Sequence, residues 1–501
     1  MQQICTEGYT DRLAIFKEFI QNADDARANV VKFLYDNRSN LQWTTHLLEP
    51  SLVQFQSRAL WVYNDAVFTE NDFQNLIRLG EGTKVNDLDK IGKFGLGFNS
   101  VYNVTDLPSL ISQQTLIMLD PHCKYLGKYG NGGIRLDFTP SQRTMLRSYK
   151  DQFEPYSGIF DYSVCELVDE SFNGTLFRLP LRTSEQAKES LLSNTVYEHH
   201  DMLELLNMLV KRGSQLLLNT QNVCKIELYE LTSQKEKPKL MCTFLKEPVR
   251  YLQQYDLTNF EVDKSQAQFV AQSSILRASA RCSQMLSSTK VINDISASYI
   301  MKTIRTSSSN ATFMKKNDTS SVTEEYWLWS AVIAFNEIDK ELLGLNEFRS
   351  FTPCGSVCFG LDKKLDDQYS IRTDAKGVVY CFLPTSIDSG LPFHINGCFA
   401  LHTDRRRLLQ KFIDDRNERQ FEWNELVLKV VCKAILFGLE NALTACGLHS
   451  FEIFKSFWPI PIKSPSLKAL KTTFLSSILN IVATVLLSLT IKELEKTSSQ
   501  N

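Results

Sequence analysis

Three polar side chains at helical spacing, Glu18, Asn22 and Asp25, could together bind a metal ion and activate a water molecule. The apolar residues around them recur at three- and four-residue steps, which predicts an amphipathic helix over residues 15–26. On that helix the three polar residues fall at i, i+4 and i+7 and share one face. A carboxylate and a carboxamide one turn apart suit a magnesium ion and a water that loses a proton. The alternative is a surface helix with a solvated acidic side.

Two downstream segments could complete a nucleotide site. The apolar run 59–64 ends at Asp65, the pattern of a buried strand that delivers a carboxylate at its tip. Residues 79–84 read Leu-Gly-Glu-Gly-Thr-Lys, and residues 91–102 read Ile-Gly-Lys-Phe-Gly-Leu-Gly-Phe-Asn-Ser-Val-Tyr. Such glycines let backbone amides approach phosphate, and a helix that opens after them favours negative charge at its N-terminus. The spacing Gly-x-x-Gly-x-Gly is not the dinucleotide fingerprint, and it lacks the Gly-Lys-Ser/Thr ending of a P-loop.

In this order the segments resemble the GHKL ATPases, the group that contains the ninety-kilodalton heat-shock chaperone, MutL and gyrase B. Within that group the chain is similar to the sacsin repeat, because it nearly repeats the wording "ELIQNADDA", "VYNDA", "LGEGTK" and "GFGLGFNSVY". The resemblance implies an α/β (α+β) two-layer sandwich of the GHKL (Bergerat) type that binds ATP and Mg²⁺. A second α/β domain and a helical C-terminal tail are expected to follow.

The resemblance also implies roles for individual residues. Glu18 matches the general base that activates the attacking water, and Asn22 matches the magnesium ligand. Asp65 matches the carboxylate that accepts the adenine amino group, and Thr175 matches the threonine that supports the adenine contact. Further nucleotide contacts are implied for Asp25, Lys84, Gly92, Gly95, Leu96, Gly97 and Phe98.

Two departures from the family pattern bear on activity. In the family, the aspartate that corresponds to Asp65 usually opens the sequence Asp-x-Gly-x-Gly. Here Ala66, Val67 and Phe68 follow Asp65 instead of glycines, so the backbone beside the expected adenine site has less conformational freedom. The first predicted helix also begins close to Met1, where family members carry an extra helix and strand. The chain is therefore expected to be an N-terminally truncated copy.

A basic turn closes the second domain. Residues 390–401 resemble the sacsin-repeat wording "GLPxHxNGxFAL", and an arginine triplet follows at 405–407. By the same resemblance, Arg406 is expected to reach the γ-phosphate and act in catalysis, because arginine offers a fixed fork for phosphate oxygens. The alternative is a solvated basic turn that pairs with Asp414 and Asp415.

Length and composition indicate several ordinary globular domains. The chain has 501 residues, of which 43% are hydrophobic and 22% charged. We expect a nucleotide-binding domain over 1–182, a middle domain over 183–415 and a helical segment over 416–501. The Ser/Thr/Asn/Lys-rich stretch 305–323 is expected to be a mobile loop within the middle domain. A formal net charge of −2 without a basic tail argues against a nucleic-acid partner.

The cysteines and the two chain ends bear on location. The 12 cysteines show no framework spacing and no signal peptide opens the chain, which predicts reduced thiols and a cytoplasmic protein. Residues 474–491 carry no charge, so their length permits a bilayer span. Their serines, threonines and asparagine favour a buried terminal helix instead. A membrane anchor and a buried helix both remain open at this point.

Three functions are compatible with these observations. The first is an ATP-binding, slowly hydrolysing, chaperone-like module that assists protein folding or quality control, with client or co-chaperone proteins as partners. The second is a non-hydrolysing interaction scaffold that keeps the fold. The third is a membrane-tethered version of either.

Overall fold

The computed structural model describes residues 12–38, 42–80, 98–126, 132–161, 171–233, 236–253, 295–308, 321–333, 354–401, 408 and 418–446. These residues form a mixed α/β fold that is rich in strands. The chain forms two compact units, one of residues 1–245 with 304–323 and the other of 246–303 with 324–501.

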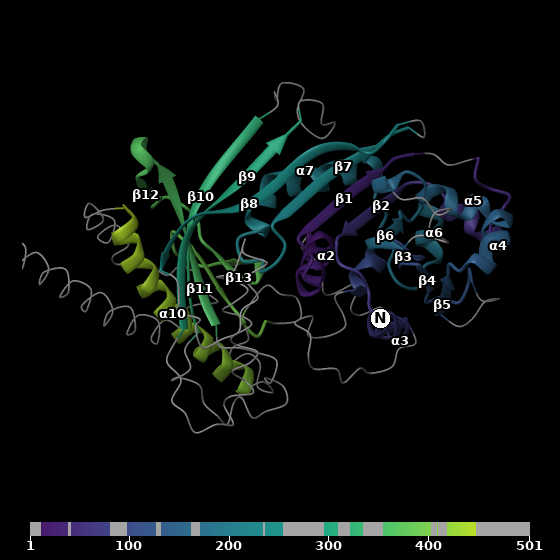
Figure 1. Ribbon diagram of the computed structural model, residues 1–501. Helices are drawn as coiled ribbons and strands as arrows, with labels where there is room; N and C mark the ends of the chain where they lie inside the picture. Colours follow the sequence, from purple (N-terminus) through teal and green to yellow (C-terminus); the bar gives the residue numbers. More distant parts are fainter. Residues whose placement is uncertain are drawn as a thin grey trace, which may run out of the picture. The chain divides into compact units, whose positions relative to one another are not determined.

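In the first unit the strands follow the order β7-β1-β2-β6-β3-β4-β5 (Figure 1). Their bounds are β1 Val30–Asp36, β2 Ala59–Asn64, β3 Ser109–Gln113, β4 Thr115–Asp120, β5 Gly132–Asp137, β6 Phe172–Pro180 and β7 Lys225–Leu231. β1 and β7 pair in parallel, and the other neighbours pair antiparallel. The strands expected from branched and aromatic runs at 30–35, 59–65, 115–119 and 174–181 are thus confirmed.

Helical segments of this unit lie between several of its strands. The α-helices are α2 Ala14–Asp25, α3 Glu70–Gly80, α4 Arg143–Ser148, α5 Lys150–Phe153, α6 Ser184–Glu189 and α7 His199–Leu216. Short 3-10 segments are η1 Pro50–Phe55, η2 Phe98–Asn103, η3 Pro140–Gln142, η4 Glu154–Tyr156 and η5 Ile159–Asp161. The capping box of Thr183 and Gln186 starts α6, since each side chain bonds the other residue's backbone N–H.

Helix α2 covers one face of this sheet through its apolar stripe. Phe16 meets Phe33 of β1 edge-on, with ring centres 5.0 Å apart, and Phe19 meets Phe177 of β6 at the same separation. Helix α7 joins it on this face, because the Tyr35 hydroxyl lies 2.9 Å from His199 Nδ1 at the start of α7. The 3.6-residue periodicity therefore identified the correct helix and its buried side.

The opposite face of the sheet is also covered, which corrects the two-layer expectation. Trp61 of β2 meets Tyr156 of η4 edge-on at 5.1 Å, and η1 contributes Leu52 and Phe55 to the same buried cluster. All four residues of the run 59–62 are buried, so both of their faces are withdrawn from water. Uninterrupted apolar strands of this kind need cover on both sides, and the short helical segments between the strands provide it.

The remaining strands follow the order β14-β13-β15-β11-β10-β9-β8, with β12 paired to β11. The bounds are β8 Lys239–Gln253, β9 Ile295–Ser307, β10 Ser321–Ile333, β11 Cys354–Lys363, β12 Tyr369–Ile371, β13 Val378–Cys381, β14 Leu383–Asp388 and β15 His394–Gly397. A 3-10 turn, η7, spans Leu365–Asp367. The long helix α10 spans Glu418–Cys446 and lies within the segment expected to be helical.

Two glycines allow α10 to approach the sheet closely. A Cβ atom on Gly355 of β11 would lie 2.6 Å from the backbone nitrogen of Val431, and one on Gly438 of α10 would lie 2.8 Å from the ring of Phe359. Trp423 then donates its indole N–H to the carbonyl of Cys398 at 2.7 Å. These contacts fix α10 over β11 and β15.

The stretch 305–323, expected to be a loop, is strand at both ends. Arg305 still belongs to β9, and Thr323 already belongs to β10. The guanidinium of Arg305 donates from its two terminal nitrogens, to the Thr323 hydroxyl at 3.0 Å and to the Val210 carbonyl at 3.4 Å. Residues 309–320 lie outside the described part of the chain. The polar composition of 305–323 therefore predicted a loop that is too long at both ends.

The segment 474–491 also lies outside the described residues. Within the part of the chain that the structure describes, no helix is long and apolar enough to cross a membrane.

A buried histidine makes the second unit sensitive to acid. His394 is 5% exposed, accepts the Val378 N–H on Nδ1 at 3.0 Å and packs between Trp327 and Tyr380. Burial lowers its pKa to about 4. Between pH 6.5 and 4 the His394 imidazole therefore binds a proton more readily in the unfolded chain than in the folded protein. The stability that neutral His394 allows is fully present above pH 6.5 and is lost as the pH falls towards 4. We expect a decrease in unfolding free energy of about 1.4 kcal/mol per pH unit there.

Urea denaturation at a series of pH values measures this slope. His394→Phe is expected to flatten it. The matched variant His200→Asn is expected to leave it unchanged, because the His200 side chain is 81% exposed. An unaltered slope in His394→Phe would assign the acid sensitivity to other groups.

Candidate functional site

The three residues expected to bind metal and water lie on α2, but their exposure differs. Glu18 is buried at 4% exposure, whereas Asn22 and Asp25 are exposed. Glu18 is the one polar residue among the buried positions of α2. The helix packs on η2, where Asn99 and Ser100 are buried. The structure thus places a carboxylate in a low-dielectric setting with a carboxamide one turn away at the surface.

Asp24, the neighbouring acid in the same motif, ties α2 to a distant segment. Its carboxylate accepts the backbone N–H groups of Gln221, Asn222 and Val223 at 2.7–3.0 Å. Its own carbonyl accepts the Asn222 side-chain amide at 2.9 Å. These bonds hold the last turn of α2 beside the start of β7. Sequence reasoning missed this role, because Asp24 and Asp25 are the same residue type at adjacent positions.

We expect Asp24→Ala to lower the unfolding free energy by about 2–3 kcal/mol, because bonds to a charged acceptor are each worth about 1.5–3 kcal/mol. Asp25→Ala is the matched control and should change stability by less than about 0.5 kcal/mol, since Asp25 is exposed. Urea denaturation measures both. Equal effects of the two substitutions would contradict the structural role of Asp24.

Asp65, expected to contact adenine, is bonded to the start of β1. Its Oδ1 accepts the backbone N–H of Asn29 at 2.7 Å and that of Val30 at 3.0 Å, and its Oδ2 accepts the Asn29 side-chain amide at 3.3 Å. Burial, together with the nearby Asp65 carboxylate, raises the pKa of Tyr63. Both carboxylate oxygens of Asp65 are therefore engaged within the protein.

A row of buried polar side chains, hereafter the polar row, lies on the α2 side of the sheet: Asn64, Thr175 and Ser112. Their side chains are 7%, 0% and 0% exposed, and they face one another in the pairing of β2, β6 and β3. The Thr175 hydroxyl lies 2.8 Å from the Ala66 carbonyl and 3.1 Å from Ser112 Oγ. Ser112 in turn donates to the Gly174 carbonyl at 2.8 Å. Polar groups so deeply buried require these partners.

The remaining predicted site residues are placed only in part. Phe98 opens η2, half-buried, with its ring 6.2 Å from that of Phe177 on the α2 side of the sheet. The other expected contacts lie outside the described residues and stay predictions: Lys84, Gly92, Gly95, Leu96, Gly97 and Arg406.

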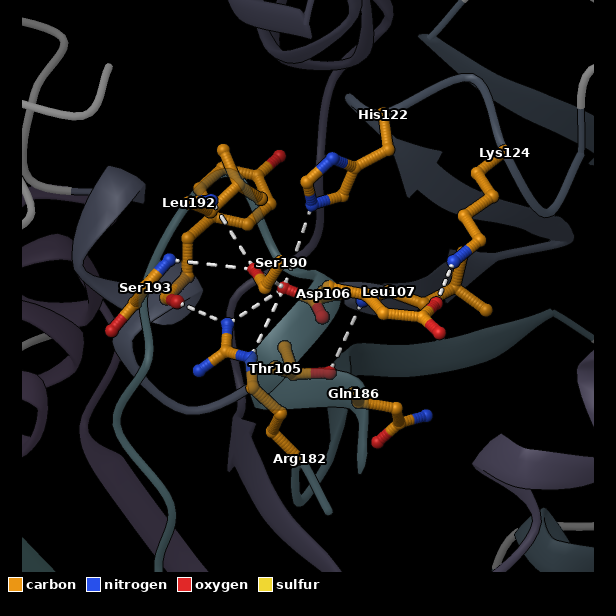
Figure 2. Close-up of polar contacts among 12 residues, drawn as sticks. Thr105, Asp106, Leu107, His122, Lys124, Arg182, Gln186, Ser190, Leu192 and Ser193 are labelled. Carbon is orange, nitrogen blue, oxygen red and sulfur yellow. Dashed lines mark hydrogen bonds and ion pairs between the residues drawn. The ribbon is translucent and has the colours of Figure 1, made fainter. Parts of the chain in front are cut away.

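A buried charge cluster holds η2 in position (Figure 2). Arg182 donates to Asp106 Oδ1 at 2.7 Å, and Ser190 donates to the same oxygen at 2.8 Å. The guanidinium also donates to the carbonyls of Tyr102 at 2.6 Å and Asn103 at 3.2 Å. Because these carbonyls end η2, Arg182 fixes the segment against which α2 packs.

His122 and Lys124 border this cluster in Figure 2. His122 Nε2 lies 3.7 Å from Asp106 Oδ1, and Lys124 pairs with Glu189 at the surface. The pair with Lys124 lowers the pKa of Glu189. These contacts connect the segment that follows β4 to Asp106 through His122 and to α6 through Lys124.

The chain resembles known proteins along most of its length. A family model described as "Sacsin domain" matches residues 2–243. Human sacsin is 29% identical over 493 residues, a match that covers 91% of this chain and 10% of that protein. A crystal structure of the N-terminal domain of a DNA repair protein aligns with 84% of this chain and 95% of that chain, at a TM-score of 0.31 and 8% identity. By these two matches the chain is similar to the sacsin family, over residues 2–243 in the family model and over most of its length in human sacsin.

Proposed function

We propose that the first unit is a GHKL-type module that binds ATP with Mg²⁺ on its α2 side and hydrolyses it slowly. The observation that carries the proposal is the pair Glu18 and Asn22 on α2, one buried and one exposed, one turn apart on the same face. A general base needs a protected setting close to its water, and a metal ligand needs access to solvent and phosphate. The similarity to the sacsin family supports this proposal.

The donor set fits a magnesium ion. Magnesium prefers oxygen ligands and keeps several waters, so the carbonyl oxygen of the exposed Asn22 is a suitable single protein ligand. When bound, the ion would supply charge neutralisation for the phosphates. Glu18 would accept the proton of the attacking water. Thr175 would contact the base from β6, and Asp25 would border the nucleotide at the end of α2.

The biological role in this proposal is a chaperone-like one, with client or co-chaperone proteins as partners in the cytoplasm. Because the match covers 10% of human sacsin, the activity of that whole protein enters here only as part of the proposal. The second candidate is a scaffold that does not hydrolyse ATP. The engaged carboxylate of Asp65 favours it, since that group is already committed to Asn29 and Val30.

Calorimetry of ATP binding with and without Mg²⁺ separates the two candidates. We expect magnesium-dependent binding that weakens about tenfold or more in Asn22→Ala, because a bond to a charged partner is worth about 1.5–3 kcal/mol. The matched control is Asn194→Ala, an exposed asparagine in the segment after α6. If the folded wild-type protein binds no nucleotide, the ATPase proposal fails and the scaffold stands.

A further inference from the structure

We propose that Lys32 is a lysine-methylation site, and that its dimethylated side chain is held by two aromatic rings and a carboxylate on the sheet face opposite α2. The rings are those of Tyr63 and Phe160, and the carboxylate is that of Glu227; these three residues are hereafter the half-cage. None of them contributes to the proposed nucleotide site, so the inference does not depend on ATP binding.

The pairing of three strands places Lys32 beside two members of the half-cage. Phe33 of β1 contacts α2, so Lys32, one residue earlier, lies on the opposite face of the sheet. Across the sheet Lys32 lies beside Tyr63 of β2 on one side and Glu227 of β7 on the other. Phe160 of η5 reaches the same place, with its ring centre 5.8 Å from that of Tyr63. The three members therefore meet around one side chain.

Phe160 reaches this position in a backbone conformation that is rare for residues other than glycine. Its φ is 52° and its ψ is 44°, in the left-handed region. Such a conformation persists only where the surrounding structure imposes it. The Phe160 ring contacts Tyr63 and also Tyr229 of β7, whose ring centre is 5.1 Å away. These contacts fix the ring beside Lys32.

The Lys32 ammonium makes only long contacts with the half-cage. Its Nζ lies 5.1 Å from the ring centre of Tyr63 and 5.2 Å from that of Phe160, within the range of a cation–π attraction. Glu227 Oε2 lies 3.8 Å from Nζ, which is longer than a hydrogen bond. The position of Nζ thus shows where a cation sits, and the distances show space around it.

Two N-methyl groups match this space. A methyl carbon lies about 1.5 Å from its nitrogen, so one that points toward each ring would lie roughly 3.6–3.8 Å from the ring centre, where carbon atoms attract most strongly. Dimethylation keeps the positive charge, so the cation–π attraction is retained. The one remaining N–H can donate to Glu227 Oε2, since a carboxylate oxygen accepts more than one hydrogen bond. A dimethylated Lys32 therefore uses all three members of the half-cage.

Methylation requires access to the nitrogen, and Lys32 provides it. Its side chain is 27% exposed and stands on a flexible four-carbon stem that can leave the half-cage. A separate methyltransferase would supply both methyl groups from a sulfonium methyl donor. In each transfer the ammonium first gives its proton to a base, and the neutral amine then attacks the methyl carbon. The N–C bond forms as the S–C bond breaks, and sulfur keeps the bonding pair as a thioether.

The fit is tested by reductive methylation of the full chain with isotopically labelled formaldehyde and a borohydride, which gives each accessible lysine a dimethylamino NMR signal. We expect the ring currents of two aromatic faces to displace one signal upfield, and this signal to be absent in Lys32→Arg. In Phe160→Leu it should move toward the undisplaced signals. The matched control is Lys225→Arg, which should remove an undisplaced signal, because Lys225 is 37% exposed and pairs with the same Glu227.

The modification is tested by mass spectrometry of the protein isolated from the cells that make it, where we expect two methyl groups on Lys32. Peptides that carry Lys32 only unmodified or acetylated would overturn the proposal, since acetylation removes the charge that the rings attract. Trimethylation would overturn the role of Glu227, because no N–H would remain. A Lys32 NMR signal at the undisplaced position would overturn the half-cage itself.

Discussion

Glu18→Gln is expected to lower the rate of ATP hydrolysis by about 10²–10⁴-fold while ATP affinity changes little. The substitution keeps the shape of the buried side chain and removes its ability to accept a proton. Glu18 lies on the face of α2 that packs against the sheet and η2, so the amide should remain in the same surroundings. Steady-state phosphate release and calorimetric affinity, measured on the same preparation, check the two halves of this prediction.

Glu204→Gln is the matched control for that experiment. Glu204 lies on α7 and pairs with Arg12 at the surface, where the two side chains are 55% and 43% exposed. Exposed pairs of this kind contribute about 0–1 kcal/mol, so both hydrolysis and affinity should stay at wild-type values. An unchanged hydrolysis rate in Glu18→Gln would exclude Glu18 as the general base.

Arg182→Met is expected to lower the unfolding free energy by about 3–5 kcal/mol, because it leaves a charge without compensation in the interior. The side chains of Arg182 and Asp106 are 0% and 1% exposed, so water cannot solvate the carboxylate in place of the guanidinium. The carbonyls of Tyr102 and Asn103 lose a donor at the same time. Urea denaturation measures the loss.

Arg12→Met removes an exposed arginine of the first unit and should cost less than about 1 kcal/mol. In the double variant Arg182→Met with Asp106→Leu, part of the loss should return, since no unpaired charge is left. A double variant as unstable as the sum of the two single variants would show that the pair is not energetically coupled.

Much of the first unit could be predicted from sequence because its elements carry strong periodicity. The stripe through Phe16, Phe19 and Ala23 indicated α2 and the side it buries. The continuous apolar run of β2 indicated a buried strand. The same apolar run of β2 also implied that both faces of the sheet are covered. The helical segments that cover the second face could not be predicted, because they are too short to show a helical periodicity.

The site was predicted less well, because residue type does not show where a side chain points. Asp24 and Asp65 have the composition of ligand-binding carboxylates, yet both accept backbone N–H groups. Whether an aspartate accepts backbone N–H groups depends on distant segments, which for Asp24 lie nearly two hundred positions away. No local sequence pattern contains that information. The face of the sheet on which Asn64 lies could have been predicted, because side chains alternate along β2 and Asn64 lies two residues after Val62.

The bonds from Asp24 to the segment before β7 have a consequence for synthesis on the ribosome. The donors at Gln221, Asn222 and Val223 follow Asp24 by 197–199 positions, and β1 needs β7 as its parallel neighbour. At a synthesis rate of about 5–20 residues per second, roughly 10–40 s pass between the synthesis of α2 and β1 and the synthesis of these partners. During that interval the apolar stripe of α2 and one edge of β1 lack their final cover. A nascent chain of this protein therefore depends on protection of its first elements until β7 has emerged.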